Sequence, residues 1–475
     1  MKILMVASEA TPFAKTGGLA DVLGALPPAL AKLGDEVAVV LPKYQSVLAE
    51  GAKRVWNFLP LSVGPTLFTA GIDEVVRDGV RYFLVDCPQL FHRAGIYGDS
   101  LGSYPDNHIR YFALTQAALG IARHIFRPDV FHCHDWQAGL LAPLLKTAFA
   151  ADPAFLRTRS IFTIHNLGYQ GNFDSTAVRE LGLDSANFHM AGLEFFGQLS
   201  FMKAGIVYSD AVTTVSPTYA REIQTPEHGF AMDGVLRTHA AKLTGILNGV
   251  DYSVWSPETD PHLAANYSAG DLSGKLACKR ALLKEMGLPA NDARPLIGIV
   301  SRFAEQKGLD LIGEIADWLT AQDVALAVLG AGDAPTQDMF LALAAQHPEK
   351  IAVRVGYADA LSHRIEAGSD MFLMPSRYEP CGLNQIYSLR YGTAPIVRAT
   401  GGLADTVDTS TGFLFEEVSS AALQLALTRA LAAFSNRTAW TERILRGMGK
   451  DFSWDASAQA YRDLYKSHAT VTEFS

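Results

Sequence analysis

Residues 15–21 read Lys15-Thr16-Gly17-Gly18-Leu19-Ala20-Asp21, and the hexapeptide Thr-Gly-Gly-Leu-Ala-Asp is repeated at residues 400–405. Each copy follows a short apolar run and precedes a helical pattern, so it lies where a strand turns into a helix. Glycines at such a turn let a ligand approach the backbone, and the amides of a helix N-terminus favour an anion. The repeat predicts two similar anion-binding loops, one near each end of the chain.

Around both copies, short β-rich runs alternate with longer helical patterns. The predicted strands are residues 2–7, 36–41, 81–86, 130–133, 160–164 and 211–215, then 296–301, 324–329, 351–355, 371–374 and 394–397. Strands that are apolar on both faces and separated by helices indicate right-handed crossovers and a parallel sheet. The sequence therefore predicts the α/β class, with two doubly wound domains.

A change of pattern near residues 245–251 predicts the domain boundary. We expect an N-terminal domain over residues 1–245 and a C-terminal domain over residues 246–453. The tail, residues 454–475, opens with an amphipathic helix pattern, which we expect to pack back on the first domain. Open α/β sheets bind ligands beyond the carboxyl ends of their strands, so a ligand is expected in a cleft between the two domains.

Composition excludes several classes of partner. The 475 residues carry a formal charge of −9, which disfavours binding to nucleic acid and to anionic lipid. No run of about 18 apolar residues offers a membrane span, and residues 3–7 predict a first buried strand rather than a signal peptide. The four cysteines include no Cys-x-x-Cys pair, which indicates reduced thiols in a cytoplasmic protein.

Charged residues follow two predicted strands of the second half. Arg302 and Lys307 lie on one loop, where both cations could reach a diphosphate without a metal ion. Glu379, in Glu379-Pro380-Cys381-Gly382-Leu383, places a carboxylate beside backbone amides. It could bind sugar hydroxyls or stabilise positive charge at an anomeric carbon. The alternatives are a solvated loop and a carboxylate that only supports a helix start.

Polar strand ends in the first half are candidates for the same cleft. His132-Cys133-His134-Asp135-Trp136 ends one predicted strand, and His165-Asn166 ends the next. A zinc site would need further ligands at recognisable spacing, and none is evident. No Asp-x-Asp pair occurs in the chain. We therefore expect polar residues lining a cleft rather than a metal site.

Taken together, these motifs resemble those of bacterial glycogen synthases and plant starch synthases. The resemblance covers essentially the whole chain and rests on five stretches, which are residues 15–21, 134–136, 163–166, 301–308 and 379–383. It implies the GT-B architecture, with two Rossmann-like domains and a deep cleft. It also implies a retaining glucosyltransferase that moves glucose from ADP-glucose to the non-reducing end 4-hydroxyl of an α-1,4-glucan. No cofactor or metal is expected, and the partners would be ADP-glucose and glycogen or a maltooligosaccharide.

The resemblance also assigns roles, residue by residue. It implies catalytic roles for Glu379, His165, Asp135, Arg302 and Lys307. It implies substrate-binding roles for Lys15, Gly18, Asp21, Tyr97, Asn166, Asn248, Tyr357, Cys381, Gly382, Leu383, Thr400, Gly401 and Gly402. Among these, Tyr357 would stack on adenine, and the amides of Gly382, Leu383, Gly401 and Gly402 would help Arg302 and Lys307 hold the diphosphate.

One position departs from many related transferases. They carry a second glutamate eight residues after the first, where this chain has Tyr387. The missing ribose-binding carboxylate favours ADP-glucose over UDP-glucose. No carboxylate is evident for double displacement, so we expect front-face transfer, in which the leaving phosphate deprotonates the acceptor.

Three other functions remain open at this point. A transferase that uses UDP-glucose and a small acceptor would share the fold and the phosphate loops. A glucan phosphorylase would need a lysine for pyridoxal phosphate, for which no motif is found. A non-catalytic binding protein would have no need for the full set of phosphate-facing groups.

Overall fold

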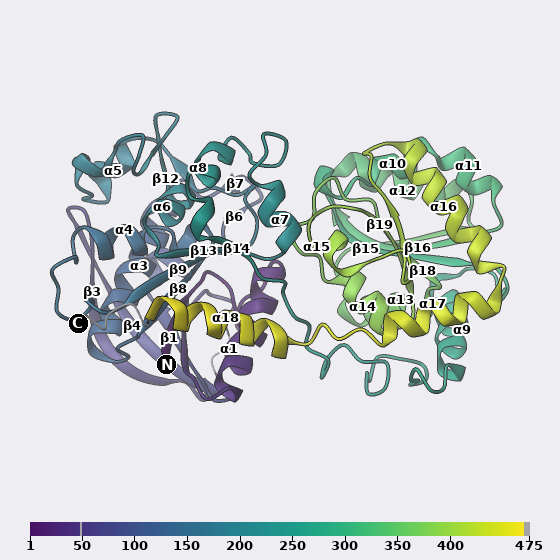
Figure 1. The fold of residues 1–475 in the computed structure, drawn as a ribbon, viewed down its shortest axis with the longest axis horizontal. Coiled ribbons are helices and arrows are strands. Elements are labelled where there is room, and N and C mark those ends of the chain that lie inside the picture. Colours follow the sequence, from purple (N-terminus) through teal and green to yellow (C-terminus); the bar gives the residue numbers. More distant parts are fainter. Residues whose placement is uncertain (48–49, 470–475) are drawn as a thin grey trace. The chain divides into compact units, whose positions relative to one another are not determined.

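The computed structural model describes residues 1–47 and 50–469, which form two units. Unit 1 contains residues 1–249 and the chain from Trp454 onward, and unit 2 contains residues 250–453. The boundary therefore lies between Gly249 and Val250 rather than after residue 245. Figure 1 shows each unit as a sheet accompanied by helices.

A nine-stranded sheet forms the centre of unit 1, in the order β14-β13-β9-β8-β1-β2-β5-β4-β3. Its parallel strands are β1 (Lys2–Val6), β2 (Glu36–Pro42), β5 (Val80–Asp86), β8 (Val130–His134), β9 (Arg159–Ile164), β13 (Ala211–Thr214) and β14 (Leu243–Gly245). β3 (Lys53–Val63) and β4 (Thr66–Arg77) extend one edge as antiparallel strands. β1 lies mid-sheet because residues 3–6 are apolar and fully buried on both faces.

Helices and short strands of unit 1 follow the sheet strands. The helices are α1 (Gly18–Lys32), α2 (Pro88–Phe91), α3 (Asn107–His124), α4 (Leu141–Lys146), α5 (Thr176–Glu180), α6 (Phe201–Tyr208), α7 (Pro217–Glu222) and α8 (Asp233–Thr238). Two small sheets pair β6 (Gly98–Asp99) with β7 (Gly102–Ser103), and β10 (Asn172–Phe173) with β12 (Gln198–Ser200) and β11 (Glu194–Phe195). Among the described residues, no helix is long and apolar enough to cross a membrane.

The last helix, α18 (Trp454–Ala469), returns to unit 1 and packs against α1 and β9. Tyr461 and Tyr465 are fully buried on its inner face. The Tyr465 hydroxyl lies 2.7 Å from Nδ1 of His132 in β8. The final helix is therefore part of the core of unit 1.

A six-stranded parallel sheet forms unit 2, in the order β17-β16-β15-β18-β19-β20. The strands are β15 (Leu296–Phe303), β16 (Ala325–Gly332), β17 (Ile351–Val355), β18 (Met371–Met374), β19 (Ala394–Arg398) and β20 (Phe413–Phe415). Numbered along the chain, this order is 3-2-1-4-5-6, that of a doubly wound nucleotide-binding fold. The strand order reverses between β15 and β18, which is where such folds bind ligands.

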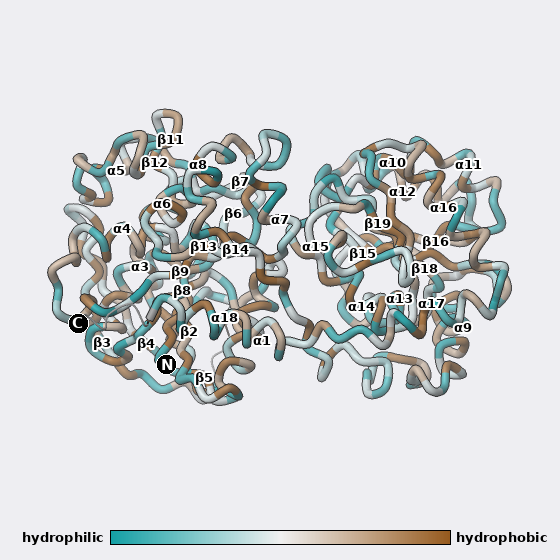
Figure 2. The backbone as a smooth tube through the Cα atoms, viewed as in Figure 1, coloured by the Kyte–Doolittle hydropathy of each residue, from teal (hydrophilic) through white to brown (hydrophobic). Residues whose placement is uncertain are grey.

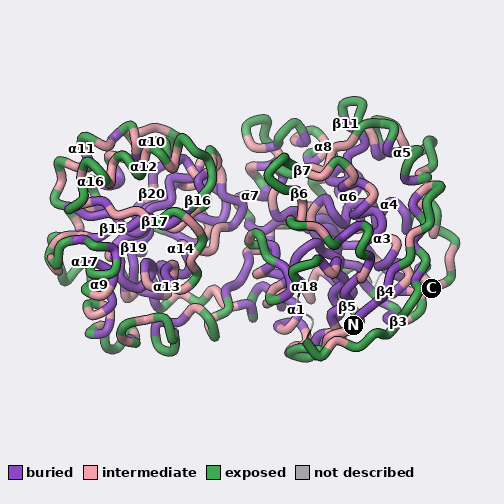
Figure 3. The backbone as a smooth tube through the Cα atoms, turned by 180° about the vertical axis from the view of Figure 1, so that it is seen from behind, coloured by how far each residue is buried: buried purple, intermediate pink, exposed green. Residues whose placement is uncertain are grey.

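Helices of unit 2 cover both faces of its sheet. Residues of α10 (Asp310–Glu314), α11 (Ala316–Ala321), α12 (Ala334–Gln346), α16 (Ser420–Phe434) and α17 (Arg437–Met448) share one core with the sheet, and α9 (Ser273–Met286), α13 (Asp359–Gly368) and α15 (Gly401–Thr406) share the other. α14 (Asn384–Arg390) follows the loop after β18. Along β18, Met371 and Leu373 enter the first core, and Phe372 and Met374 enter the second. The central strands are accordingly hydrophobic in Figure 2 and buried in Figure 3.

Candidate active site

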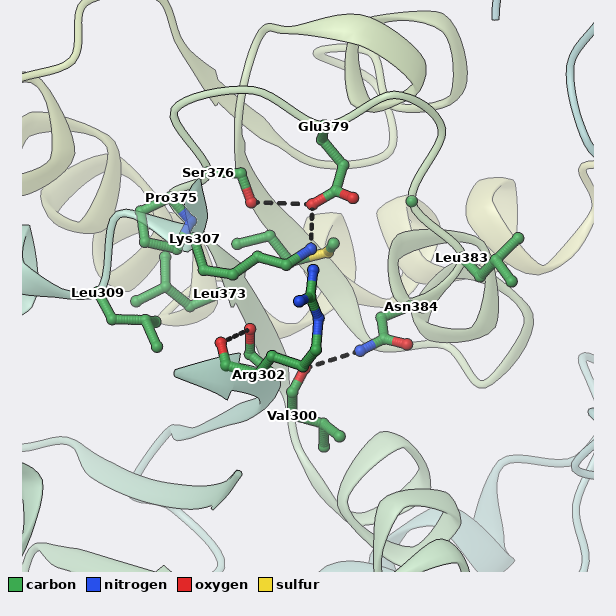
Figure 4. A pocket seen from close by; sticks show the side chains of 13 residues that line it. Val300, Arg302, Lys307, Leu309, Leu373, Pro375, Ser376, Glu379, Leu383 and Asn384 are labelled. Carbon is green, nitrogen blue, oxygen red and sulfur yellow. Dashed lines mark hydrogen bonds and ion pairs between the residues drawn. The ribbon is translucent and has the colours of Figure 1, made fainter. Parts of the chain in front are cut away.

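A pocket of about 150 Å³ opens at the carboxyl ends of β15 and β18, where the strand order of unit 2 reverses. Its lining includes Arg302, Lys307 and Glu379, three of the residues predicted to be catalytic (Figure 4). Parallel strands end at the same edge of a sheet, so the loops after β15 and β18 meet there. The sheet topology brings together charged groups that lie 77 positions apart in the sequence (302 to 379).

Lys307 and Glu379 form an ion pair in this pocket. The Nζ atom of Lys307 lies 2.6 Å from Oε2 of Glu379. The same carboxylate oxygen accepts a hydrogen bond of 3.0 Å from the hydroxyl of Ser376. Glu379 is buried and Lys307 is half-buried, so the pair is only partly screened by solvent. The lysine balances the buried carboxylate, and the hydroxyl fixes its orientation.

Arg302 is the exposed cation of the pocket. Its guanidinium donates to Oε1 of Gln306 at 3.3 Å, and Gln306 in turn donates to the carbonyl oxygen of Tyr378 at 3.2 Å. These contacts hold the loop after β15 against the loop after β18. A planar guanidinium next to an ammonium group is suited to a phosphate or diphosphate.

The loop from Glu379 to Leu383 contacts the second copy of the hexapeptide. A Cβ at Gly401 would collide with the carbonyl oxygen of Glu379, and a Cβ at Gly402 would collide with that of Cys381. The amide of Gly402 donates to the carbonyl oxygens of Glu379 and Pro380 at 3.1 and 3.2 Å. The prediction that this amide binds a diphosphate is therefore corrected, because the fold already uses it.

Other predicted residues of unit 2 flank this loop. Gly382 has a φ of +69°, which favours glycine, and Cys381 is buried with its carbonyl bonded to Gln385. Thr400 is buried, and its amide donates to the carbonyl of Arg398 at 2.9 Å. Leu383 lines the pocket and directly precedes α14. These residues shape the backbone around the charged groups.

Tyr357 and Tyr387 are placed very differently. Tyr357 follows β17, has an 81% exposed side chain and donates to Oδ1 of Asp359 at 3.2 Å. Tyr387, at the position where related transferases carry a glutamate, is buried and stacks on Trp255 with ring centroids 3.8 Å apart. An exposed aromatic ring can stack on a base, whereas Tyr387 belongs to the core.

In unit 1, residues of the first hexapeptide copy bind the carboxylate of Glu9. This carboxylate follows β1, is 2% exposed, and accepts hydrogen bonds from the amides of Thr16 and Gly17 and from the Thr16 hydroxyl. Tyr97 also donates to Glu9 and lies 2.8 Å from the hydroxyl of Ser8. Burial raises the pKa of Tyr97 well above its ordinary value, and Tyr111 and Glu9 raise it further. The loop therefore binds an anion, but that anion is a residue of the chain.

The outer part of this loop remains accessible. Nζ of Lys15 lies 2.7 Å from Oδ1 of Asp21, and both side chains are partly exposed. A Cβ placed at Gly17 or Gly18 would meet nothing within 4 Å. The two copies of the hexapeptide thus need glycine for different reasons. In the first copy the glycines leave open space beside the backbone. In the second copy they allow the backbone to pack against the loop from Glu379 to Leu383.

Asp135 lies at the corresponding reversal of strand order in unit 1, directly after β8. Its Oδ1 accepts from the amides of His165 and Asn166 at 2.7 and 3.4 Å. Its φ of +54° is unusual for a residue other than glycine and indicates a backbone held by its surroundings. Burial raises the pKa of Asp135 to about 7, although the two amides oppose the shift and Glu9 adds to it.

Three histidines lie side by side under this site. Nε2 of His165 is 2.9 Å from Nδ1 of His134, and the rings of His132 and His134 are 4.0 Å apart. Burial lowers the pKa of His165 to about 3 and that of His132 to about 3. All three are buried and therefore neutral near pH 7. The expectation that His132 and His134 line a cleft is wrong, because they belong to the core.

Two asparagines complete the predicted set in unit 1. Asn166 accepts from the amide of Gly168 at 3.0 Å, which orders the turn after β9. Asn248 is 6% exposed, and within the described residues its Oδ1 has no hydrogen-bond partner. A buried amide oxygen without a partner is energetically costly and is suited to a ligand hydroxyl.

Sequence reasoning missed Glu9 and Ser376. Glu9 lies three residues after the end of β1, and Ser376 lies two residues after the end of β18. Glu9 could have been predicted, because Ser8-Glu9 follows the first apolar run. Polar residues after a parallel strand lie at the edge of the sheet where ligands bind.

Comparison with known proteins agrees with this arrangement. A family model described as "Starch synthase catalytic domain" matches residues 2–238, and one described as "Glycosyl transferases group 1" matches residues 285–445. Curated glycogen synthases of Koribacter versatilis and Myxococcus xanthus are 48% and 47% identical, over 99% and 100% of both chains. The catalytic domain of starch synthase IV from Arabidopsis thaliana, bound to ADP and acarbose, superposes with a TM-score of 0.91 at 33% identity. That match covers 98% of this chain and 99% of the other. Sucrose-phosphate synthase of Thermosynechococcus elongatus, with a TM-score of 0.63 at 18% identity, shares the fold.

Proposed function

The chain belongs to the family of bacterial glycogen synthases and starch synthases, and we propose that it transfers glucose from ADP-glucose to the 4-hydroxyl at the non-reducing end of an α-1,4-glucan. It is a glucosyltransferase of the GT-B fold. The observation that carries the proposal is the grouping of Arg302, Lys307 and Glu379 in one pocket at the strand-order reversal of unit 2. Two cations and a buried carboxylate are the groups that a sugar diphosphate requires.

In unit 2, Arg302 and Lys307 bind the diphosphate and stabilise the charge that develops as ADP departs. Glu379 binds the hydroxyls of the transferred glucose. Tyr357 stacks on adenine, which its exposed ring permits. The amides near Gly382 and Leu383 approach the phosphates, and the buried Tyr387 leaves no carboxylate for a ribose, which favours ADP-glucose as donor.

In unit 1, the groups around Asp135 act on glucose. Asp135 and His165 stabilise positive charge at the anomeric carbon, since a carboxylate attracts it directly and a neutral imidazole does not repel it. Asn166 and Asn248 bind hydroxyls. Lys15 and Gly18 contact the diphosphate, with Asp21 holding the lysine, and Tyr97 positions Glu9 behind the loop.

The chemistry proceeds with retention of configuration at the anomeric carbon. The bond from that carbon to the phosphate oxygen breaks, and a bond to the acceptor oxygen forms on the same face. The proton of the acceptor hydroxyl passes to the departing phosphate oxygen. Arginine and lysine replace a metal ion in balancing the diphosphate, so the transfer proceeds without metal.

The decisive experiment measures transfer of labelled glucose to glycogen from ADP-glucose and from UDP-glucose, with and without a chelator. We expect incorporation from ADP-glucose that persists in chelator and that Glu379→Ala lowers about 10²–10³-fold. A higher kcat/KM with UDP-glucose, or loss of activity in chelator, would reject the donor or the metal-independent chemistry. Incorporation of label into a free sugar, without incorporation into glycogen, would reject the α-1,4-glucan as the acceptor.

The state of the thiols supports our proposal for the cellular location. Cys87, Cys133, Cys278 and Cys381 are all buried, and in the described part of the chain none of them forms a disulfide. Free buried thiols are typical of reducing compartments. We therefore place the enzyme in the cytoplasm, where fractionation with a periplasmic marker tests the assignment.

A further inference from the structure

A second cluster of potential ligands lies in unit 2, formed by residues that do not line the pocket of Arg302, Lys307 and Glu379. His262, Asp359 and His363 place one nitrogen or oxygen atom each within 4.8 Å of one another. In a tetrahedral zinc site with bonds of about 2.0–2.1 Å, ligand atoms lie about 3.3 Å apart. The separations therefore exceed those of a loaded site by at most about 1.5 Å.

Two of the ligands share one face of α13. Asp359 begins the helix and His363 lies four positions later, so their side chains project from successive turns of one face. The same spacing lets two helical residues share a metal ion in zinc enzymes. The third residue, His262, comes from the loop that precedes α9. A helix and a loop therefore converge on one point.

Asp260 organises both histidines. Its Oδ2 lies 2.7 Å from Nδ1 of His363, and its Oδ1 accepts from the amide of His262 at 2.9 Å. The bond to Nδ1 leaves Nε2 of His363 as the atom available to a metal. A carboxylate behind a histidine ligand is the usual outer partner in metal sites, where it fixes the tautomer and raises the basicity of the ligand nitrogen.

The ring of His363 is also fixed by stacking. It is 2% exposed and lies parallel to Trp255, with centroids 3.7 Å apart and planes 9° apart. Trp255 stacks on Tyr387 on its other side. His262 and Asp359 are exposed, so they can move by the ångström or so that the narrower spacing requires. His363 is therefore held in place, whereas His262 and Asp359 can shift toward a metal ion.

Charge balance and ligand type favour a divalent cation. Asp359 and Asp260 supply two carboxylates, whose negative charges offset those of a divalent cation. Two histidines and a carboxylate suit zinc with an open position for water. We propose that His262, Asp359 and His363 bind one Zn²⁺ ion, with Asp260 as the outer partner of His363.

Binding at this site has a local consequence. Asp359 Oδ1 accepts the hydroxyl of Tyr357 at 3.2 Å. A zinc ion that binds Asp359 competes with this hydrogen bond from Tyr357. The site does not take part in glucose transfer, which is expected to persist in chelator.

The test uses the full chain, without an affinity tag, after removal of metal by a chelator. Titration with Co²⁺ is followed by visible absorption, and Zn²⁺ is then added to displace it. We expect one ion per chain and the absorption of a low-symmetry site with nitrogen ligands. His262→Ala and Asp359→Asn should each weaken binding at least about tenfold. Both residues are exposed, so the fold is retained, which the melting temperature without metal checks.

His189→Ala is the matched control, because His189 is an exposed histidine of unit 1. It should bind Co²⁺ and Zn²⁺ as the wild type does, and Zn²⁺ should raise the melting temperature of both. The proposal is overturned if the wild type takes up no ion at micromolar concentration. It is equally overturned if His262→Ala and Asp359→Asn bind with the wild-type stoichiometry and affinity.

Discussion

The ammonium group of Lys307 lies 2.6 Å from the carboxylate of Glu379, at the point where the strand order of unit 2 reverses. Each residue is the closest counter-charge of the other in the pocket without ligand. A diphosphate would compete with Glu379 for Lys307, and glucose hydroxyls would then donate to the carboxylate. The ion pair therefore keeps both groups in place before the substrate arrives.

Removing either member of this pair should lower the rate. We expect Lys307→Ala and Glu379→Ala each to reduce kcat/KM about 10²–10³-fold, because each removes an electrostatic contact to the reacting groups. The double variant should lose less than the product of the single losses, since the residues contact each other. Steady-state kinetics with ADP-glucose and glycogen measures all three.

A surface ion pair provides the control for that series. Asp292 pairs with Arg280 at 2.5 Å and lies on the surface, so Asp292→Asn should leave kcat/KM within about twofold. Near-normal rates in Glu379→Ala or Lys307→Ala would remove both residues from the catalytic set.

Lys15→Ala should separate activity from stability. The contact with Asp21 is partly exposed, so its loss should change the free energy of unfolding by no more than about 1 kcal/mol. Turnover should fall at least about tenfold, because the proposed contact between this charge and the diphosphate is lost. Ala399→Gly, at the equivalent position before the second copy, should reduce kcat less. Equal losses in the two variants would contradict unequal roles of the two copies.

Alanine at one glycine of each hexapeptide copy should distinguish space for a ligand from packing. Gly17→Ala meets nothing within 4 Å and has an extended φ of −158°, so we expect a change in unfolding free energy within about 0.5 kcal/mol. Gly402→Ala collides with the carbonyl of Cys381 and should destabilise unit 2 by about 1–3 kcal/mol. Urea denaturation followed by tryptophan fluorescence compares them. Equal stability of the two variants would contradict the packing role.

Asp135 should make stability fall as pH rises. Its pKa is about 7 in the folded chain, chiefly through burial, and about 3.9 when unfolded. Between these values the folded state binds more protons, so stability decreases as pH rises from about 4 to about 7. Asp135→Asn keeps an oxygen for the amides of His165 and Asn166 and removes this dependence.

Urea denaturation of both proteins at pH 5 and pH 8 checks the prediction. The stability of Asp135→Asn relative to the wild type should be greater at pH 8 than at pH 5, by a few kcal/mol. The comparison between proteins cancels the contribution of the buried histidines, whose lowered pKa values act in the opposite direction. A difference that is independent of pH would show that the carboxyl of Asp135 titrates normally.

Tyr465→Phe should weaken unit 1. The change leaves Nδ1 of His132 buried without its partner, which costs about 1–3 kcal/mol. Tyr169→Phe is the control, because the side chain of Tyr169 is 57% exposed and should tolerate the change. Chemical denaturation measures both variants. If they unfold at the same urea concentration, the buried bond contributes nothing to unit 1.

Much of the fold could be predicted because most strands are buried on both faces and therefore form continuous apolar runs. β1 and β18 are examples, and their observed limits differ from the predicted ones by at most one residue. β3 and β4 were not predicted. They form a half-exposed antiparallel edge with register shifts between Arg54 and Leu59, which break the alternating pattern that would mark them.

The candidate site was predictable where it depends on strand ends. Glu379 and Asp135 each follow a recognisable strand, whereas Arg302 lies inside β15, one residue beyond the predicted end of that strand. The sheet topology of unit 2 then brings Arg302 and Glu379 together. The contact between Glu9 and the first hexapeptide copy was not predictable. The same backbone amides can donate to a carboxylate of the chain or to a phosphate, and the sequence does not distinguish the two. The contact between Tyr465 and His132 joins residues 333 positions apart, which no local pattern reports.

The return of α18 to unit 1 determines the order in which the chain can mature on the ribosome. Residues 250–453 emerge as one continuous stretch, so unit 2 can fold during synthesis. Unit 1 begins first but waits for its final helix, and until then the surface that receives Tyr461 and Tyr465 is uncovered. The nascent protein therefore holds an incomplete first unit throughout translation of the second, and a ribosome that stalls late would release a chain prone to aggregation.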